Sequence, residues 1–166
     1  MREPLNLQRS DSTDCPRCHQ LGRAVSAVTI EAMLIAEAKA RLTQTDGFHF
    51  CATPECDVAY FHPASREVFL QRDVRVPVFQ KSTNPNRLVC YCFGHTVAEI
   101  RAEFRAKGSS WIREDIKTKC AQGLDACERN NPQGSCCLGN VQRVIREAGA
   151  GNVPPDPGSS GCCCGG

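Results

Sequence analysis

Apolar and polar residues alternate along the chain with two periods, which predict strands in its first half and helices in its second. Residues 29–42 are rich in strong helix formers with apolar side chains every four residues, which predicts one helix. Residues 48–51 predict a short strand, and the β-prone runs 58–61 and 67–70 predict a hairpin around the turn 62–65. A further alternation, with Pro77 inside it, predicts a strand at the edge of a sheet. The apolar positions of the helix are Ile30, Leu34 and Ala38, and those of the edge strand are Val74, Val76 and Val78.

Three amphipathic helices are predicted in the second half. Thr96-x-x-Glu99 is a capping-box pattern that starts the first of them, and Gly108 is expected to end it. Ser109 or Ser110 is expected to cap the second helix, which Gly123 ends, and the third begins at about residues 136–138. The apolar positions are Val97, Ile100 and Phe104 in the first helix, Ile112, Ile116 and Cys120 in the second, and Leu138, Val141 and Ile145 in the third.

Together these elements predict an α+β protein in two small modules. The first would be an α/β module built on cysteine knuckles and the second a helical module. Polar, turn-prone residues at the start and glycine, proline and cysteine at the end favour no fold. The expected segments are a disordered lead at 1–14, a first module at 15–82, a second module at 83–150 and a disordered tail at 151–166.

The bulk composition excludes several classes of function. A net charge of +2 with only 6% aromatic residues provides no basic stripe interleaved with aromatics, so no nucleic-acid partner is expected. No apolar run is long enough to span a membrane and the start of the chain has no apolar signal region, which indicates a cytoplasmic protein without membrane insertion. No serine–histidine–aspartate set, carboxylate pair or phosphate-binding loop stands out, so the chain is not expected to be an enzyme.

Cysteine dominates the chemistry, with 13 residues in a chain of 166. The number is odd and no secretion signal is present, so metal binding is expected in place of disulfides. Two knuckles, one C-x-x-C and one C-x4-C, supply the four thiolates that tetrahedral zinc requires. The alternative is four reduced cysteines in a core. The predicted zinc ligands are Cys15, Cys18, Cys51 and Cys56.

A second set of cysteines predicts a [2Fe–2S] cluster. The C-x-C pair Cys90 and Cys92 is followed by Cys127 and then by Cys136-Cys137 at a predicted helix start, where backbone N–H groups stabilise negative charge. Cys137 is preferred over Cys136 as the fourth ligand because it lies one turn before Val141, and Cys136 remains the alternative. Cys120 is expected to be a buried apolar residue.

The tail carries three further thiols, Cys162, Cys163 and Cys164, within a glycine-rich setting. Soft, exposed thiols of this kind suit transient capture of Cu(I) or another thiophilic ion. The alternative is a reactive tail with no assigned task.

The series of motifs resembles one family. It consists of Cys15-Pro16-x-Cys18, Phe50-Cys51-x4-Cys56 running to Phe61, Val89-Cys90-Tyr91-Cys92-Phe93, and Asn131-Pro132-x-Gly134-x-Cys136-Cys137. Over residues 13–148 it resembles the N-terminal region of the CopZ-type iron–sulfur copper metallochaperones. The second half is also similar to bacterioferritin-associated ferredoxins, which are helical [2Fe–2S] modules.

The resemblance implies zinc on the four knuckle cysteines and a [2Fe–2S] cluster on Cys90, Cys92, Cys127 and Cys137. It also implies cytosolic copper trafficking: one-electron reduction of Cu(II) to Cu(I), then delivery to a copper-exporting P-type ATPase. Full-length chaperones of this type continue into a domain with an M-x-C-x-x-C copper loop, which this sequence lacks. The tail cysteines or a separate copper-binding protein would then replace that loop in binding and delivering Cu(I). Two other functions stay open: a ferredoxin-like electron carrier, and a structural adaptor that holds both metals without a copper role.

Overall fold

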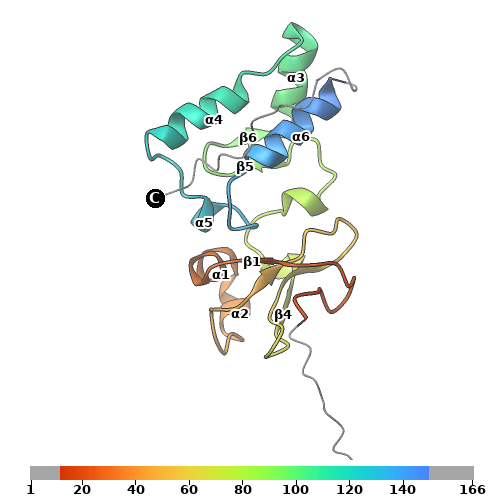
Figure 1. Cartoon of the computed structure of the whole chain (residues 1–166), viewed down its shortest axis with the longest axis vertical. Coiled ribbons are helices and arrows are strands. Elements are labelled where there is room, and N and C mark those ends of the chain that lie inside the picture. The colour runs from red at the N-terminus through yellow and green to blue at the C-terminus, as the bar shows by residue number, and fades with distance from the viewer. Residues whose placement is uncertain (1–11, 150–166) are drawn as a thin grey trace, which may run out of the picture.

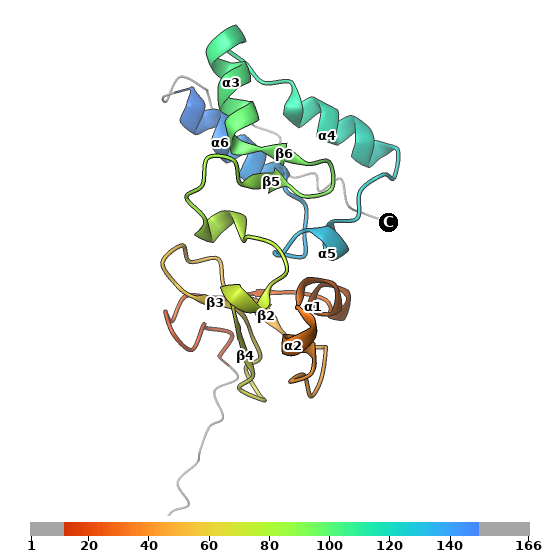
Figure 2. The same cartoon turned by 180° about the vertical axis from the view of Figure 1, so that it is seen from behind.

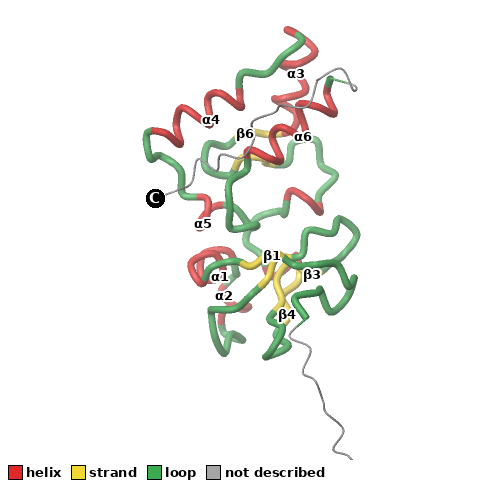
Figure 3. The backbone as a smooth tube through the Cα atoms, viewed as in Figure 1, coloured by secondary structure: helices red, strands yellow, loops and turns green. Residues whose placement is uncertain are grey.

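The computed structural model describes residues 12–149 and shows two tiers (Figure 1). Strands gather in the lower tier and most of the helical residues lie in the upper one, as the tube in Figure 3 shows. The protein therefore has the α+β fold that its sequence pattern predicts. The expected tail and most of the expected lead, together with Cys162, Cys163 and Cys164, lie outside the described residues. Asp14, at the end of the expected lead, pairs with Leu21 in an isolated β-bridge.

The lower tier is an antiparallel sheet in the order β1-β2-β3-β4. The β3–β4 hairpin confirms the prediction, although a register shift interrupts it between Val58 and Tyr60. All four residues of β3 are buried, because Ala59 and Tyr60 face the main core while Val58 and Phe61 pack against the cysteine knuckles. This strand therefore joins the core to the thiol site. The strands are β1 (Arg23–Ala24), β2 (His49–Phe50), β3 (Val58–Phe61) and β4 (Val68–Leu70).

The single helix predicted for residues 29–42 is wrong, because two short helices, α1 (Ala27–Met33) and α2 (Ala36–Lys39), take its place. Leu34 lies between them in an extended conformation and pairs with Val74. The N–H of Ile35 donates to the carbonyl of Asp73 (2.9 Å), and that of Arg75 donates to the carbonyl of Met33 (2.8 Å). Tertiary hydrogen bonds thus replace the helical ones, which local helix propensity cannot anticipate.

The edge strand predicted around Val74, Val76 and Val78 is also wrong. Val74 makes only an isolated bridge, and two 3₁₀ turns, η1 (Gln71–Asp73) and η2 (Phe79–Lys81), flank the segment. The three valines pack on the main core of the sheet tier. Their alternation reflects burial of a connecting segment, in which Pro77 has no N–H for a sheet.

The upper tier holds three longer helices and one short helix beside a two-stranded ribbon (Figure 2). The capping box at Thr96 and Glu99 is present, and Gly108 ends the first helix with a φ of 70°, so both predictions are confirmed. Ser110 is not the N-cap residue of the second helix, which is Trp111, but the Ser110 hydroxyl still accepts the N–H of Ile112 (3.4 Å). The elements are β5 (Leu88–Cys90), β6 (His95–Thr96), α3 (Val97–Lys107), α4 (Ile112–Ala121), the short α5 (Cys127–Asn130) and α6 (Leu138–Ala148).

Helices α3, α4 and α6 share one apolar core. Most of the positions predicted from the helical spacing are buried there, and Cys120 is buried among them. Phe104 and Leu138 are only partly buried at its margin. Within residues 12–149, the model contains no helix with the length and apolarity needed to cross a membrane.

Direct contacts join the two tiers. Helix α5 lies beside α1 in both ribbon views, and the two helices are in contact (Figures 1 and 2). The buried hydroxyl of Tyr60 donates to the carbonyl of Pro132 (2.5 Å), and Arg75 donates to the carbonyl of Arg129 (3.0 Å). Gln80 donates to Gln133 (2.7 Å) at the same boundary. The loop that precedes α6 is therefore held by the sheet tier.

Candidate metal centres

Four cysteines from the two knuckles converge in the sheet tier. Their Sγ atoms all lie within 4.8 Å of one another. Cys15 lies 3.8 Å from Cys56, and Cys18 lies 3.6 Å from Cys51. A tetrahedral zinc ion with Zn–S bonds of about 2.3 Å separates its sulfur atoms by roughly 3.8 Å. The donor set and its spacing therefore fit a zinc tetrathiolate.

Backbone hydrogen bonds hold each knuckle in shape. In the first knuckle the N–H of Cys15 donates to the carbonyl of Gln20 (2.8 Å), and that of His19 donates to the carbonyl of Cys15 (2.9 Å). In the second, the N–H of Cys51 donates to Ala59 of β3 (2.9 Å). The knuckles are thus anchored to the sheet, which presets the positions of the sulfur atoms.

The pKa values of the knuckle thiols are shifted in opposite directions. Burial is the main reason that the pKa of Cys15 rises to about 12, and burial also raises the pKa of Cys56. Burial has the same effect on Cys18, but hydrogen bonds with Thr53, with the backbone at Gln20 and with neighbouring thiols outweigh it and lower the pKa of that thiol to about 6. Zinc ligands must be thiolates, so metal binding at this group would release protons from the thiols whose pKa is raised.

Lys81 is a contributor that sequence reasoning missed. Its ammonium group donates to the carbonyls of Thr53 (2.7 Å) and Cys56 (2.8 Å) and lies 3.8 Å from the Sγ of Cys51. The residue belongs to η2 and follows Cys56 by 25 positions. No sequence motif marks it, because only the tertiary fold brings the lysine to the knuckle.

The four preferred ligands of the second set form two pairs, and Cys137 also bonds to Cys136, the alternative ligand. Cys92 lies 3.7 Å from Cys127, and Cys90 is hydrogen-bonded to Cys137. In the part of the chain that the structure describes, no second group of three or more such ligands converges as tightly as the knuckle set. Two separate pairs are what a [2Fe–2S] cluster requires, since each of its two irons takes two protein ligands.

Local structure explains how these pairs form. Cys90 ends β5, and Cys92 lies in the tight turn that leads to β6. Cys127 begins α5, and Cys137 is the N-cap residue of α6. The C-x-C turn therefore directs one sulfur to α5 and the other to α6.

Hydrogen bonds make the Cys92 thiol acidic. Its pKa falls to about 6, first because of the bond with Cys127 and then because Ala126 N–H (3.4 Å) and Asn130 Nδ2 (3.9 Å) donate to its sulfur. The bond with Cys137 also lowers the pKa of Cys90. Donors aimed at a ligand sulfur raise the reduction potential of an iron–sulfur cluster.

Cys136 and Cys137 differ in their surroundings. Cys137 is 2% exposed, and hydrogen bonds with Cys136 and Cys90 raise its pKa. Cys136 is partly exposed, and its carbonyl accepts a hydrogen bond from Gln133 (2.8 Å). The buried position of Cys137 beside Cys90 favours Cys137 as the fourth ligand.

The turn η2 touches both thiol sites. Lys81 contacts the knuckles, the N–H of Phe79 donates to the hydroxyl of Tyr91 (2.9 Å) in the C-x-C turn, and Gln80 contacts Gln133 ahead of Cys136. Three consecutive residues thus link the two sites.

Comparison with known proteins agrees with this geometry. Residues 12–75 match the CopZ family model of a zinc binding domain, which covers the knuckle cysteines. The X-ray structure of the Archaeoglobus fulgidus CopZ N-terminal domain matches with a TM-score of 0.64 and 25% sequence identity, over 79% of this chain and 96% of that one. No curated protein matches the chain in sequence. The knuckle site, the fold and these two matches together support a CopZ-type N-terminal region, with four cysteines placed to hold a metal ion.

Proposed function

We propose that this chain is a metallochaperone-type protein that binds zinc in its first half and a [2Fe–2S] cluster in its second, and that it takes part in copper trafficking. The observation that carries the proposal is the contrast between the two thiol sets. One set converges as a single tetrahedron-sized group, and the other forms two pairs.

Zinc would be held by Cys15, Cys18, Cys51 and Cys56. The match to a zinc binding domain supports this assignment, as does the ammonium group of Lys81, which offsets the negative charge of four thiolates. The site is closed by four protein ligands, so its task is structural.

The cluster would be held by the pairs Cys92 with Cys127 and Cys90 with Cys137. When bound, it would supply one electron at a time, which is the number needed to reduce one Cu(II) to Cu(I). The chain's own residues would stabilise the bound ligands through the N–H groups directed at Cys92. Thiolate ligands persist in a reducing compartment, so this work belongs in the cytosol.

The copper role is proposed because of the structural likeness to the CopZ N-terminal domain. The partners that follow from it are a copper-exporting P-type ATPase or a separate copper-binding protein. The tail cysteines Cys162, Cys163 and Cys164 would bind Cu(I) transiently.

The first test is metal and sulfide analysis of the anaerobically purified full chain, with an EPR spectrum after reduction. We expect about two irons, two sulfides and one zinc per chain and a reduced [2Fe–2S] signal. Cys137→Ser should remove iron and sulfide and keep zinc, whereas Cys136→Ser should keep all three. Zinc without iron or sulfide in the wild-type chain would eliminate the redox half of the proposal.

A second candidate is an electron carrier without a copper role, and the partial exposure of Cys92 favours it, since a cluster near the surface can exchange electrons with a docked partner. Copper binding separates the two. Replacement of Cys162, Cys163 and Cys164 by serine should lower Cu(I) binding in the chaperone and should change nothing in a carrier that binds no copper.

A further inference from the structure

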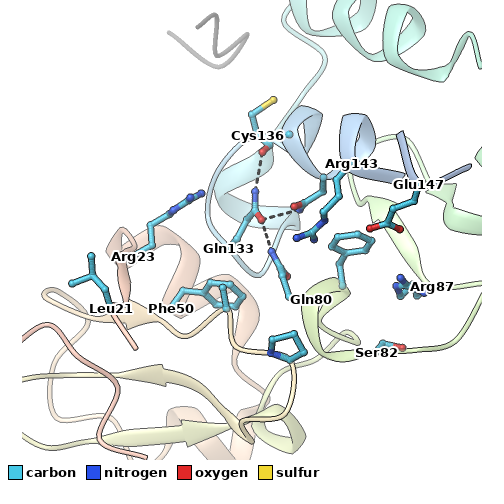
Figure 4. A pocket seen from close by; sticks show the side chains of 15 residues that line it. Leu21, Arg23, Phe50, Gln80, Ser82, Arg87, Gln133, Cys136, Arg143 and Glu147 are labelled. Atoms are coloured by element: carbon cyan, nitrogen blue, oxygen red, sulfur yellow. Dashed lines mark hydrogen bonds between the residues drawn. The ribbon is translucent and has the colours of Figure 1, made fainter. Parts of the chain in front are cut away.

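A cavity of about 530 Å³ opens where the two tiers meet. Figure 4 shows Arg23 on the sheet side, Arg87, Arg143 and Glu147 on the helical side, and Gln80 with Gln133 between them. Its volume is in the range of small-molecule sites. The cavity adjoins both thiol sites, because its lining includes Ala52 and Pro54 of the second knuckle and Cys136, but none of the eight predicted zinc and cluster ligands lines it.

Positive charge is concentrated in this cavity. Its charged lining residues are three arginines and one glutamate, a net charge of +2, which equals the formal net charge of the whole chain. Among residues 12–149, no ion pair joins any of the three arginines to a carboxylate. The formal charges of all other residues sum to zero, so the formal net charge of the chain equals that of the residues lining this cavity.

Arg87 and Arg143 both lie over the ring of Phe79. Their Cζ atoms lie 5.1 and 5.3 Å from the centre of the Phe79 ring. Arg87 donates through Nη1 to the carbonyl of Asn84 (3.0 Å), but its Nε is buried and has no hydrogen-bond partner among the described residues. A buried donor without an acceptor is unfavourable, and charge-assisted bonds from an anion to the other nitrogen atoms of this guanidinium would offset that cost.

The electrostatics of Arg87 agree with that geometry. Burial, followed by the positive charge of Arg101, lowers the pKa of its guanidinium, and Glu147 only partly opposes this effect. The charged form of Arg87 therefore lacks compensation, which a bound anion would provide.

The amide groups at the floor do not compete for the arginines. Gln80 and Asn140 both donate to Oε1 of Gln133 (2.7 and 2.9 Å), and Nε2 of Gln133 donates to the carbonyl of Cys136. This network is satisfied internally and fixes the floor, which leaves the guanidinium groups available for a ligand.

We propose that this cavity binds a small oxyanion, a phosphate or a carboxylate, between the guanidinium groups of Arg87 and Arg143. Guanidinium groups match the oxygen spacing of both anions and form charge-assisted hydrogen bonds with them. The space beyond the two arginines can accommodate an organic group attached to the anion. The site requires neither metal, so it stands independently of the function proposed above.

The test is calorimetric titration of the zinc-loaded full chain with sodium phosphate and, separately, with sodium succinate, each against sodium chloride at equal ionic strength. We expect saturable binding of at least one oxyanion and none of chloride. Arg143→Gln should weaken binding by about tenfold or more, because it removes a charge-assisted contact. Arg143 and Arg146 are both exposed residues of α6, and only Arg143 lines the cavity, so Arg146→Gln makes the same charge change outside the lining and should leave affinity unchanged within about twofold.

Each outcome is decisive. Saturation by phosphate alone or by succinate alone supports the site and identifies its oxyanion. Absence of saturation with both anions, or equal weakening by Arg143→Gln and Arg146→Gln, overturns it. Circular dichroism of each variant checks folding, and a ¹H–¹⁵N spectrum that follows the Arg87 Nε resonance locates the binding independently of the variants.

Discussion

Replacement of Lys81 by methionine tests how the zinc knuckles are stabilised. The change keeps the apolar stem of the side chain and removes the ammonium group that donates to Thr53 and Cys56 and lies 3.8 Å from the Sγ of Cys51. A zinc tetrathiolate carries a net double negative charge, so the knuckle loses a neighbouring positive charge as well as two hydrogen bonds.

The magnitude follows from these contacts. A unit charge at about 4 Å is worth about 4 kcal/mol at an effective dielectric constant of 20, and solvent screening of a half-buried ammonium reduces this to about 1–2 kcal/mol. We therefore expect zinc affinity to fall by roughly 5–30-fold, which overlaps the losses seen when a group supporting a metal ligand is removed. The two lost hydrogen bonds should lower the free energy of unfolding of the zinc form by about 2 kcal/mol.

The assay is competition for zinc with a chromogenic chelator, combined with thermal unfolding followed by circular dichroism. Lys39→Met is the matched control, because Lys39 is an exposed lysine at the end of α2, in the same half of the chain. Equal zinc affinities for the two variants would refute the role assigned to Lys81. Lys81→Arg keeps the charge and should retain most of the affinity.

Three further predictions follow from the structure. Cys92→Ser should remove the [2Fe–2S] signal from the EPR spectrum while the zinc content stays the same. Cys120 lies in the helical core, so the control variant Cys120→Ser should keep the signal. Loss of iron from both variants would contradict the pairing of Cys92 with Cys127. Gly134→Ala should lower the free energy of unfolding by about 1–3 kcal/mol in denaturant titrations. The reason is that Gly134 has a φ of 68° and that a Cβ atom there would lie 2.8 Å from Oγ1 of Thr29. A Cβ atom at Gly139 would have no neighbouring atom within 4 Å, so Gly139→Ala should be neutral or stabilising. Asp115→Asn should lower the free energy of unfolding by about 0.5–1 kcal/mol at pH 7. The bond with Lys119 and then that with His95 keep the pKa of Asp115 below its ordinary value of 3.8, so this stability is complete above pH 3.8 and is lost as the pH falls through the depressed value; a mutational difference that persisted in full at low pH would contradict the argument.

Local sequence patterns predicted the parts of the fold that are determined locally. The capping box at Thr96, the stop at Gly108 and the β3–β4 hairpin each depend on residues a few positions apart, and each is present. The helix expected over residues 29–42 is interrupted because the N–H of Ile35 donates to Asp73 and the carbonyl of Met33 accepts from Arg75, in place of bonds along one continuous helix. Propensity says nothing about a partner forty residues away.

The same limit applies to the thiol sites. Spacing alone identified the knuckle cysteines, since a C-x-x-C turn brings its sulfur atoms together wherever it occurs. It could not show that Lys81 reaches the knuckles, because no short-range pattern contains that lysine. Nor could it show how the C-x-C pair divides its sulfur atoms between α5 and α6.

Under the function proposed above, that division is how one kind of ligand would specify two different groups in one short chain. In the sheet tier two knuckles face each other, so Cys15 lies against Cys56, Cys18 lies against Cys51, and all four sulfur atoms converge. In the helical tier the C-x-C turn faces two separate helix starts, so Cys92 meets one partner, Cys127, and Cys90 meets another. A single ion needs convergence, and a two-iron cluster needs two pairs held apart. The backbone around the cysteines, and not their number, therefore determines which group each half of the chain is suited to hold.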